Sequence, residues 1–179
     1  MLLLLLLSTL ANLAELVSAQ HSINRTLTRG WGTVPSQRRY INATQSWDVI
    51  EAGVQQSMAI GVPNSIAVLD PSAQLVAFLR MDNAFLSSVD ISIKKAKTVS
   101  LFNGLYPSNA LYARSQPGSE GDLYGIEETN GGLVVFGGGQ PIVDSEGFWI
   151  GSVGVSGGTN EQDVEVSVAA AGAVGTQSG

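Results

Sequence analysis

The stretch FWIGSVGVSGGTNEQD, residues 148–163, decides the fold that this chain is expected to take. Phe148–Val155 is an apolar run of strand length, rich in aromatic and β-branched residues, and it predicts a buried strand. Ser156-Gly157-Gly158 is a turn signal, and Asn160 is a favourable N-cap for a helix with Asp163 in its first turn. The face of that last helix expected to pack inward carries Val164, Val168 and Ala171.

Upstream of this stretch, the apolar spacing predicts a helix followed by a β-hairpin. Ser46 is the expected N-cap of the helix, and Gly61 and Pro63 end it. Ser65–Asp70 and Gln74–Met81 are apolar runs on either side of a Pro-Ser-Ala turn, which is typical of a hairpin. The helix face expected to pack inward carries Trp47, Ile50, Val54 and Met58.

A second helix and a glycine-rich region complete the pattern. Ser87-Ser88-Val89-Asp90 resembles a capping box and opens the helix. Residues 105–130 predict a long loop with one short helix around Asn109–Arg114, and Leu133–Phe136 predicts a further strand. Few strands with flanking helices predict an α+β fold with an antiparallel sheet rather than a doubly wound fold.

Composition limits the functions that such a fold can serve. The 179 residues contain no cysteine, which excludes disulfides, thiolate catalysis and cysteine-based zinc sites, and a single histidine, which excludes a histidine-rich metal centre. The net charge of −6 argues against nucleic acid as the main partner. The length suits one domain with a hydrophobic core of its own.

The N-terminus predicts a secretory leader over residues 1–19. A run of leucines follows Met1, and the apolar stretch is shorter than the about 20 residues that span a bilayer. It ends in the small-residue pattern Val17-Ser18-Ala19, so cleavage would leave a secreted chain that begins at Gln20, whereas an uncleaved anchor is the alternative. Two glycosylation sequons, at Asn24 and Asn42, agree with an extracellular glycoprotein.

Charge and composition divide the rest of the chain. Residues 20–42 contain arginines and no acidic residue, and they predict an irregular basic arm that is solvated, folded back on the acidic body, or extended to a neighbour in an oligomer. Residues 43–172 are expected to form the domain, and residues 173–179 a frayed tail. Once the leader is removed, no membrane contact is expected.

Gly154-Val155-Ser156-Gly157-Gly158 fits the G-x-S-x-G pattern of a nucleophile elbow. A serine nucleophile needs a base, and in that triad the histidine follows the serine along the chain. No histidine follows His21, so the sequence argues against a serine hydrolase. The backbone amides of Ser156–Thr159 and the start of the last helix also suit a cradle for a carboxylate or phosphate, and a tight turn that needs positive φ is the structural alternative.

Arg80-Met81-Asp82, at the end of the hairpin, is a second candidate site, with Lys95 on the next helix. An arginine can bind a carboxylate through two parallel hydrogen bonds, whereas an ion pair of Asp82 with Arg80 or a lysine is the structural alternative. Gly137-Gly138-Gly139 adds a flexible loop that either forms a bulge or lines a pocket. We expect these segments and the Ser156-Gly157-Gly158 turn to converge on one concave ligand-binding site.

Several of these segments, in this order, resemble the family of GlcG- and HbpS-type proteins, which includes a domain at the end of some cobalamin adenosyltransferases. The resembling segments are PNSIAVLD (63–70), LVAFLRMD (75–82), KAKT (95–98), GGQPI (138–142) and IGSVGVSGG (150–158). The resemblance implies a profilin-like α+β fold with about five antiparallel strands, and assembly into dimers or larger homo-oligomers. It also implies binding of haem or related small ligands, sometimes with haem degradation or iron sequestration.

The chain departs from the family pattern at two points. Asn83 stands where the family usually has glycine after Arg-Met-Asp, and the folded part has no counterpart of the histidines proposed as iron ligands in some members. A haem iron would therefore need Met58, Met81, a tyrosine, a hydroxyl group or His21 from the arm.

Three functions remain open from the sequence. The first is a secreted binding protein for haem or another flat organic ligand. The second is a cofactor-free enzyme, such as an isomerase or cyclase, that acts on a small metabolite with an ionisable pair such as Asp82 and Lys95. The third is a purely structural oligomer.

Overall fold

The computed structural model describes residues 25–118 and 121–175, so the leader, His21 and Asn24 lie outside the described residues. The strands are β1 (Ser65–Leu69), β2 (Leu75–Arg80), β3 (Gly139–Val143) and β4 (Trp149–Ser156). The α-helices are α2 (Ala43–Ala59), α3 (Ser88–Leu101), α4 (Tyr112–Ser115) and α5 (Asn160–Gly175). Short 3₁₀ helices are η1 (Thr26–Thr28), η2 (Pro35–Gln37), η3 (Ser108–Leu111) and η4 (Ile126–Gly131).

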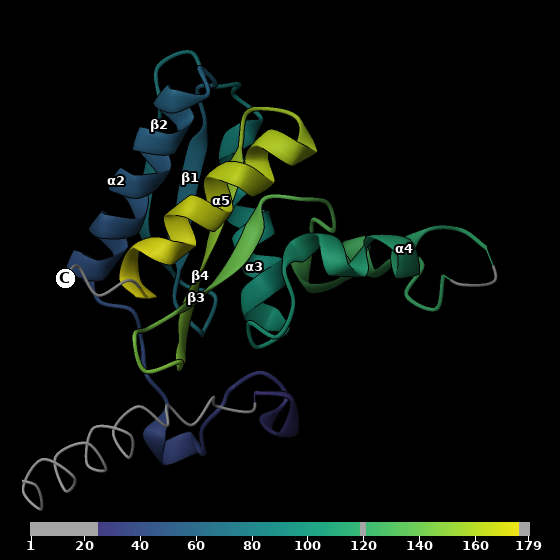
Figure 1. Ribbon diagram of the computed structural model, residues 1–179. Coiled ribbons are helices and arrows are strands. Elements are labelled where there is room, and N and C mark those ends of the chain that lie inside the picture. Colours follow the sequence, from purple (N-terminus) through teal and green to yellow (C-terminus); the bar gives the residue numbers. More distant parts are fainter. Residues whose placement is uncertain (1–24, 119–120, 176–179) are drawn as a thin grey trace, which may run out of the picture.

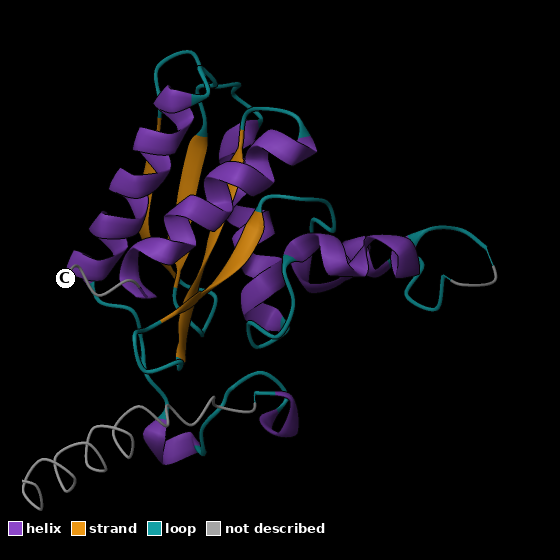
Figure 2. Cartoon of the chain, in the orientation of Figure 1, coloured by secondary structure: helices purple, strands orange, loops and turns teal. Residues whose placement is uncertain are grey.

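The four strands form one antiparallel sheet in the order β2-β1-β4-β3. Helices α2 and α5 cover one face of the sheet and α3 covers the other, while α4 and its loop extend to one side (Figures 1 and 2). The α+β class with an antiparallel sheet is therefore confirmed. In the described part of the chain, no helix is both long enough and apolar enough to cross a membrane.

The core divides along the alternation of β1. Ile66 and Val68 pack with the apolar side chains of α2 and α5, whereas Ala67 and Leu69 pack against Ala96 of α3. Because successive strand residues point to opposite faces, a continuous apolar run such as Ser65–Leu69 is what a strand covered on both faces requires. Every residue of β4 is also buried, which agrees with the strand expected at Phe148–Val155.

The sheet has four strands rather than about five, because Leu133–Phe136 is not a strand. Its backbone pairs with side chains instead of a neighbouring strand: Val134 N donates to Thr98 Oγ1 at 3.0 Å, and Phe136 O accepts from Ser108 Oγ at 2.6 Å. Leu133 is nonetheless buried, so the apolar run packs over α3 as an extended segment.

Helix α2 packs inward with only part of the face predicted from the sequence, because Ile50 is buried in the core and Val54 packs against it, whereas Trp47 and Met58 do not. Its N-cap is Asn42, not Ser46: Asn42 Oδ1 accepts from Gln45 N at 2.9 Å, and Gln45 Oε1 accepts from Asn42 N at 3.1 Å. Trp47 and Met58, expected to face inward, are 61% and 69% exposed. The residues that α2 buries are small or branched: Ser46, Val49, Ile50, Gly53 and Ser57.

Two other helix predictions also need correction. Ser87 precedes α3 with no side-chain cap hydrogen bond, so the predicted capping box is absent there. Helix α5 continues to Gly175, which places the first part of the predicted tail inside the helix. Val168 of α5 is 54% exposed, and the residues that α5 buries are Asp163, Val166, Ser167 and Ala170.

The described part of the basic arm folds back on the body. The Arg39 guanidinium bonds both carboxylate oxygens of Glu146, at 2.7 and 2.9 Å, and Asp144 at 3.0 Å. This raises the pKa of Arg39 further above its usual range, because its charged form gains these hydrogen bonds. Trp31 packs edge-on against buried Trp149 with ring centroids 4.8 Å apart. Charge attraction and aromatic packing therefore hold the arm near the β3–β4 turn (Figure 1).

Helix α3 lies directly against the backbone of β4, and this predicts the effect of Gly154→Ala. A Cβ at Gly154 would lie 2.0 Å from Ser92 O and 2.7 Å from Ala96 N, both backbone atoms of α3. We expect urea unfolding to show a loss of at least about 1–3 kcal/mol in the free energy of unfolding, as for overpacked cores.

Gly172→Ala is the matched control for this prediction, because a Cβ at Gly172 would meet nothing within 4 Å on α5. We expect that substitution to stabilise the protein by about 0.5–1 kcal/mol through helix propensity. Equal effects of the two substitutions would contradict the close contact of α3 with β4.

Candidate functional site

The segments singled out in the sequence lie at one end of the sheet. Ser65, at the start of β1, pairs with Arg80 of β2 on one side and with Ser156 of β4 on the other. Since directly paired residues share a face, Arg80 and Ser156 project to the same face, the one covered by α3. Ser65 Oγ lies 2.8 Å from Ser88 Oγ at the start of α3, which closes this face. Arg80 and Ser156 are still two strands apart, or about 10 Å at the usual strand spacing.

The Gly137-Gly138-Gly139 loop leads into β3 at the same end and is packed against its neighbours. Gly138 has φ +112°, and its carbonyl accepts from Val155 N at 2.8 Å. A Cβ at Gly138 would lie 2.8 Å from Lys95 Nζ, and one at Gly137 would lie 2.6 Å from Val164 Cγ2. These positions require glycine because the backbone of the loop lies directly against a buried charged group and leaves no space for a side chain.

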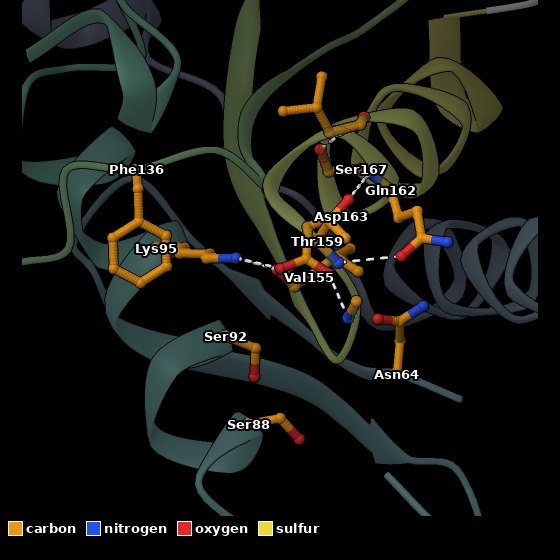
Figure 3. Close-up of polar contacts among 12 residues, drawn as sticks. Asn64, Ser88, Ser92, Lys95, Phe136, Val155, Thr159, Gln162, Asp163 and Ser167 are labelled. Carbon is orange, nitrogen blue, oxygen red and sulfur yellow. Dashed lines mark hydrogen bonds and ion pairs between the residues drawn. The ribbon is translucent and has the colours of Figure 1, made fainter. Parts of the chain in front are cut away.

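That buried charge is an ion pair between α3 and α5. Lys95 Nζ lies 2.5 Å from Asp163 Oδ2 and 2.9 Å from Val155 O, and both side chains are enclosed, at 0% and 4% exposure (Figure 3). The ring of Phe136 lies 5.0 Å from Lys95 Nζ and covers it on another side. Burial lowers the pKa of Lys95 and raises that of Asp163, because desolvation penalises both charged forms, while their mutual attraction opposes this.

Asp163 also organises the turn that was expected to cradle an anion. Its second oxygen, Oδ1, accepts from Gly158 N at 2.9 Å. Thr159 and Gln162 form a reciprocal cap: Thr159 N donates to Gln162 Oε1 at 2.9 Å, and Gln162 N donates to Thr159 Oγ1 at 3.3 Å. The amides of Gly158 and Thr159 are thus used within the protein. The segment is thus a closed turn rather than an open anion site. The expectation that this turn needs positive φ is wrong, because neither Gly157 nor Gly158 has positive φ; glycine is needed there because a Cβ would lie 2.3 Å from Pro63 O at Gly157 and 2.7 Å from Gln162 Oε1 at Gly158.

Arg80-Met81-Asp82 stays at the outer part of the same sheet end. Met81 pairs with Asn64 twice: Met81 N donates to Asn64 O at 3.0 Å, and Asn64 N approaches Met81 Sδ at 3.4 Å. Arg80 and Asp82 are exposed, and in the described part of the chain neither forms an ion pair. Lys95, expected to pair with Asp82, pairs with Asp163 instead. The reason is topological: Lys95 projects from α3 toward β4 and α5, not toward β2.

A cavity of about 520 Å³ opens on the other side of Phe136. Its lining is aromatic, aliphatic and amide-bearing, with one carboxylate, and consists of Asn109, Tyr112, Phe136, Gly137, Asn160, Glu161 and Val164. Of the residues predicted to bind a ligand, only Gly137 lines it. The structure thus gathers the predicted segments at one sheet end, but Arg80 and the Ser156-Gly157-Gly158 turn do not line this cavity.

The described residues contain neither a triad nor a metal centre. Ser156 is the last residue of β4, 6% exposed and paired in the sheet, so it is not presented on a strained elbow. No histidine lies within residues 25–118 or 121–175. Those residues also hold no cluster of three or more histidine, cysteine or acidic side chains that suits a metal ion.

Comparison with known proteins gives the family. A model described as "Haem degrading protein HbpS-like" matches residues 41–172. The chain belongs to the HbpS-like family. A 15.0 kDa protein of the dhaT–dhaS intergenic region of Citrobacter freundii is 40% identical over 109 residues, 60% of this chain and 73% of that protein.

Two solved structures extend this finding. Klebsiella pneumoniae ORFY superimposes with a TM-score of 0.71 at 32% identity, over 81% of this chain and 98% of that one. The structure of PduOC in complex with heme superimposes with a TM-score of 0.68 at 29% identity, over 75% of this chain and 95% of that one. The GlcG- and HbpS-type resemblance stated from the sequence is therefore confirmed.

In this HbpS-like protein, the lining residues that the sequence analysis missed come from the short helices η3 and α4, from the segment before the glycine loop and from the first turns of α5. Tyr112 sits in a short helix within the long 105–130 loop, and Phe136 directly precedes the glycine loop. Phe136 could have been predicted from the sequence, since an aromatic residue next to a run of glycines is suited to line a ligand-binding site. Asn109 and Glu161 could not have been predicted, because amide and carboxylate side chains are common everywhere on protein surfaces.

The enclosed pair predicts a strong effect of removing one charge. Lys95→Met should leave Asp163 buried without its partner and cost about 3–5 kcal/mol in the free energy of unfolding, measured by urea denaturation. Asp163→Asn should cost a similar amount because it strands the ammonium group. The double variant Lys95→Met/Asp163→Asn should lose less free energy of unfolding than the two single variants together, because the difference in this double-mutant cycle measures the coupling of the two charges. Additive losses would show that the two charges act independently and contradict the pair.

Proposed function

We propose that this protein binds a small, flat, largely apolar organic ligand, of which haem is the leading candidate, in the cavity beside Phe136. The supporting observation is the cavity itself, whose volume of about 520 Å³ lies in the range of small-molecule sites. The PduOC–heme complex, similar at 29% identity over most of this chain, supports haem as the first ligand to test.

The lining suits a flat ring. Phe136 and Tyr112 offer aromatic faces, and Val164 adds an aliphatic surface. Gly137 has no side chain, so a ring can approach the backbone closely there. Asn109 and Asn160 supply amide groups at the cavity wall that can donate hydrogen bonds to polar substituents.

The lining also defines how haem would be held. Tyr112 carries the phenol oxygen, a known type of haem iron ligand, and it is the residue we assign to that role. Met81 is a poorer candidate because its sulfur faces Asn64 N, and Met58 lies exposed on α2, away from this cavity. Glu161 disfavours a carboxylate beside the start of α5, so the haem propionates would point away from α5.

The alternative of a cofactor-free enzyme receives one supporting observation, the buried Lys95–Asp163 pair behind Phe136. A general acid or base must come within hydrogen-bond reach of its substrate. Here Lys95 already donates to Val155 and Asp163, and Asp163 also accepts from Gly158. Both groups serve the fold, and we therefore favour binding over catalysis.

Replacing Phe136 or Tyr112 should separate cavity shape from iron ligation. In titrations of the purified protein with haemin, Phe136→Ala should weaken binding at least about tenfold, equivalent to 1.4 kcal/mol, because it removes one wall. Tyr112→Phe should change the visible absorption spectrum of the bound haem, since the ring stays but the phenol oxygen is lost.

Tyr124→Phe is the control for these variants, because Tyr124 is exposed and does not line the cavity. It should match the wild type in affinity and spectrum. If the wild type binds neither haemin nor any flat ligand in a thermal-shift screen, or if Phe136→Ala binds as tightly, the proposal is wrong.

We also propose that the protein is secreted after cleavage of residues 1–19 and that it assembles as a homo-oligomer, as the family resemblance implies. The apolar side chains of β4 and most of those of Leu133–Phe136 are buried within one chain, so a contact between subunits has to use other surfaces. Other exposed apolar side chains, such as Phe85 and Leu86 before α3, are available for such a contact.

Light scattering of the mature protein at micromolar concentration tests the assembly. We expect a mass at least twice that of one chain. A single-chain mass across the whole concentration range would contradict the oligomer without affecting the ligand proposal.

A further inference from the structure

One side of α2 carries a groove whose apolar lining is partly shared with the core, since Ile50 is buried in the core and Val54 and Leu79 pack against it. It has a volume of about 620 Å³ and runs between α2 and Leu79 of the edge strand β2. Trp47 lines it and is 61% exposed, whereas tryptophan side chains are on average highly buried. Polar groups surround the tryptophan within the lining: Thr44, Asp48, Glu51 and Gln55.

A glycosylation sequon begins at the edge of this groove. Asn42-Ala43-Thr44 fits N-x-T, Asn42 is exposed, and both Ala43 and Thr44 line the groove. The capping box uses the Oδ1 and the backbone N of Asn42. The side-chain nitrogen Nδ2, which is the atom that carries an N-linked glycan, takes no part in the cap. Modification of Asn42 therefore leaves the start of α2 intact.

The direction of the helix brings Trp47 toward the modified residue. Side chains on an α-helix lean toward its N-terminus, so the indole of Trp47 covers the turn that contains Ala43 and Thr44. These residues lie three and four positions before Trp47, on the same side of the helix. A sugar attached to Asn42 therefore begins within about one helical turn of the indole, next to two residues that line the same groove.

We infer that Asn42 carries an N-linked glycan whose first sugars lie in this groove against Trp47. The inference rests on the secretion proposed above and is independent of the ligand cavity. In the transfer, Asn42 Nδ2 attacks C1 of a lipid-linked oligosaccharide diphosphate. The N–C1 bond forms, the bond from C1 to the phosphate oxygen breaks, Nδ2 loses one proton, and the lipid diphosphate leaves.

The chemistry of the groove matches a sugar. The C–H groups on one face of a pyranose carry partial positive charge, and they are attracted to the negative face of an indole ring. Carboxylates and amides beside the ring can bond the sugar hydroxyl and acetamido groups, as Asp48, Glu51 and Gln55 are placed to do. The acidic rim also disfavours a negatively charged occupant.

Occupancy is tested by secreting the full chain from a eukaryotic host and analysing tryptic peptides. The segment Tyr40–Arg80 contains no internal lysine or arginine, so its mass reports on Asn42 separately from Asn24. It should carry hexosamine and hexose that a peptide-N-glycosidase removes. Asn42→Asp and Thr44→Ala should both abolish this mass while Thr44→Ser keeps it, and Asn42→Asp retains an N-cap oxygen.

The position of the glycan is tested by hydroxyl-radical labelling before and after enzymatic release. Release leaves an aspartate at position 42, so the cap survives and only the sugars are lost. Labelling of Trp47 should rise several-fold on release, whereas exposed Tyr124, which lies far along the chain in the 105–130 loop, should not change. The thermal midpoint should fall on release in the wild type and stay constant in Trp47→Ala.

Two results would overturn the inference. One is a Tyr40–Arg80 peptide that carries no sugar, either because the chain is not secreted or because Asn42 is not glycosylated. The other is an occupied Asn42 with equal labelling of Trp47 before and after release. Haemin binding by the same preparations tests the ligand proposal separately, so failure of one does not imply failure of the other.

Discussion

The ion pair of Lys95 with Asp163 is the interaction on which this end of the fold depends. It joins α3 to α5 across the end of β4, and the same carboxylate holds the Gly158 amide while the same ammonium holds the Val155 carbonyl. Two charges taken out of water are stable only when their remaining hydrogen-bonding capacity is met. The surrounding backbone meets it, so the conformation of the turn and the docking of α5 are fixed together (Figure 3).

The glycines follow from this constraint. A charge pair enclosed by backbone leaves no space for a side chain at Gly138, where a Cβ would lie within 3 Å of both Lys95 and Asp163. Gly154 also has no space for a side chain, here because the backbone of α3 lies directly against β4. Sequence motifs that resemble a nucleophile elbow and an anion-binding loop therefore arise here from close packing. The surface left for a ligand begins beyond Phe136, which separates the pair from the cavity.

More of the fold than of the candidate site could be predicted from the sequence. Strand β4, the β1–β2 hairpin and the positions of the main helices follow from apolar runs and turn residues, which are local signals. The partner of Lys95 was not predictable, because Asp82 and Asp163 are equally plausible until the strand order places β4 and α5 beside α3. Leu133–Phe136 has strand composition, yet side chains of Thr98 and Ser108 take the hydrogen bonds that a strand would give a neighbour.

Helix α2 shows why the period of a helix does not by itself identify its inner face. Of the predicted apolar stripe, Ile50 is buried in the core and Val54 packs against it, whereas Trp47 and Met58 stay exposed. The other buried positions of α2 are mostly small, Ser46, Val49, Gly53 and Ser57, and they let the helix lie close to α5 and β1. A Cβ at Gly53 would lie 2.8 Å from Ile66 Cδ1, which shows how close that approach is. Size therefore decided which part of the stripe packs inward, and the two large side chains of Trp47 and Met58 remained outside. An exposed tryptophan has to be covered or tolerated, and the position of Trp47 one turn from the exposed Asn42 gives the sequon and this side chain one common explanation.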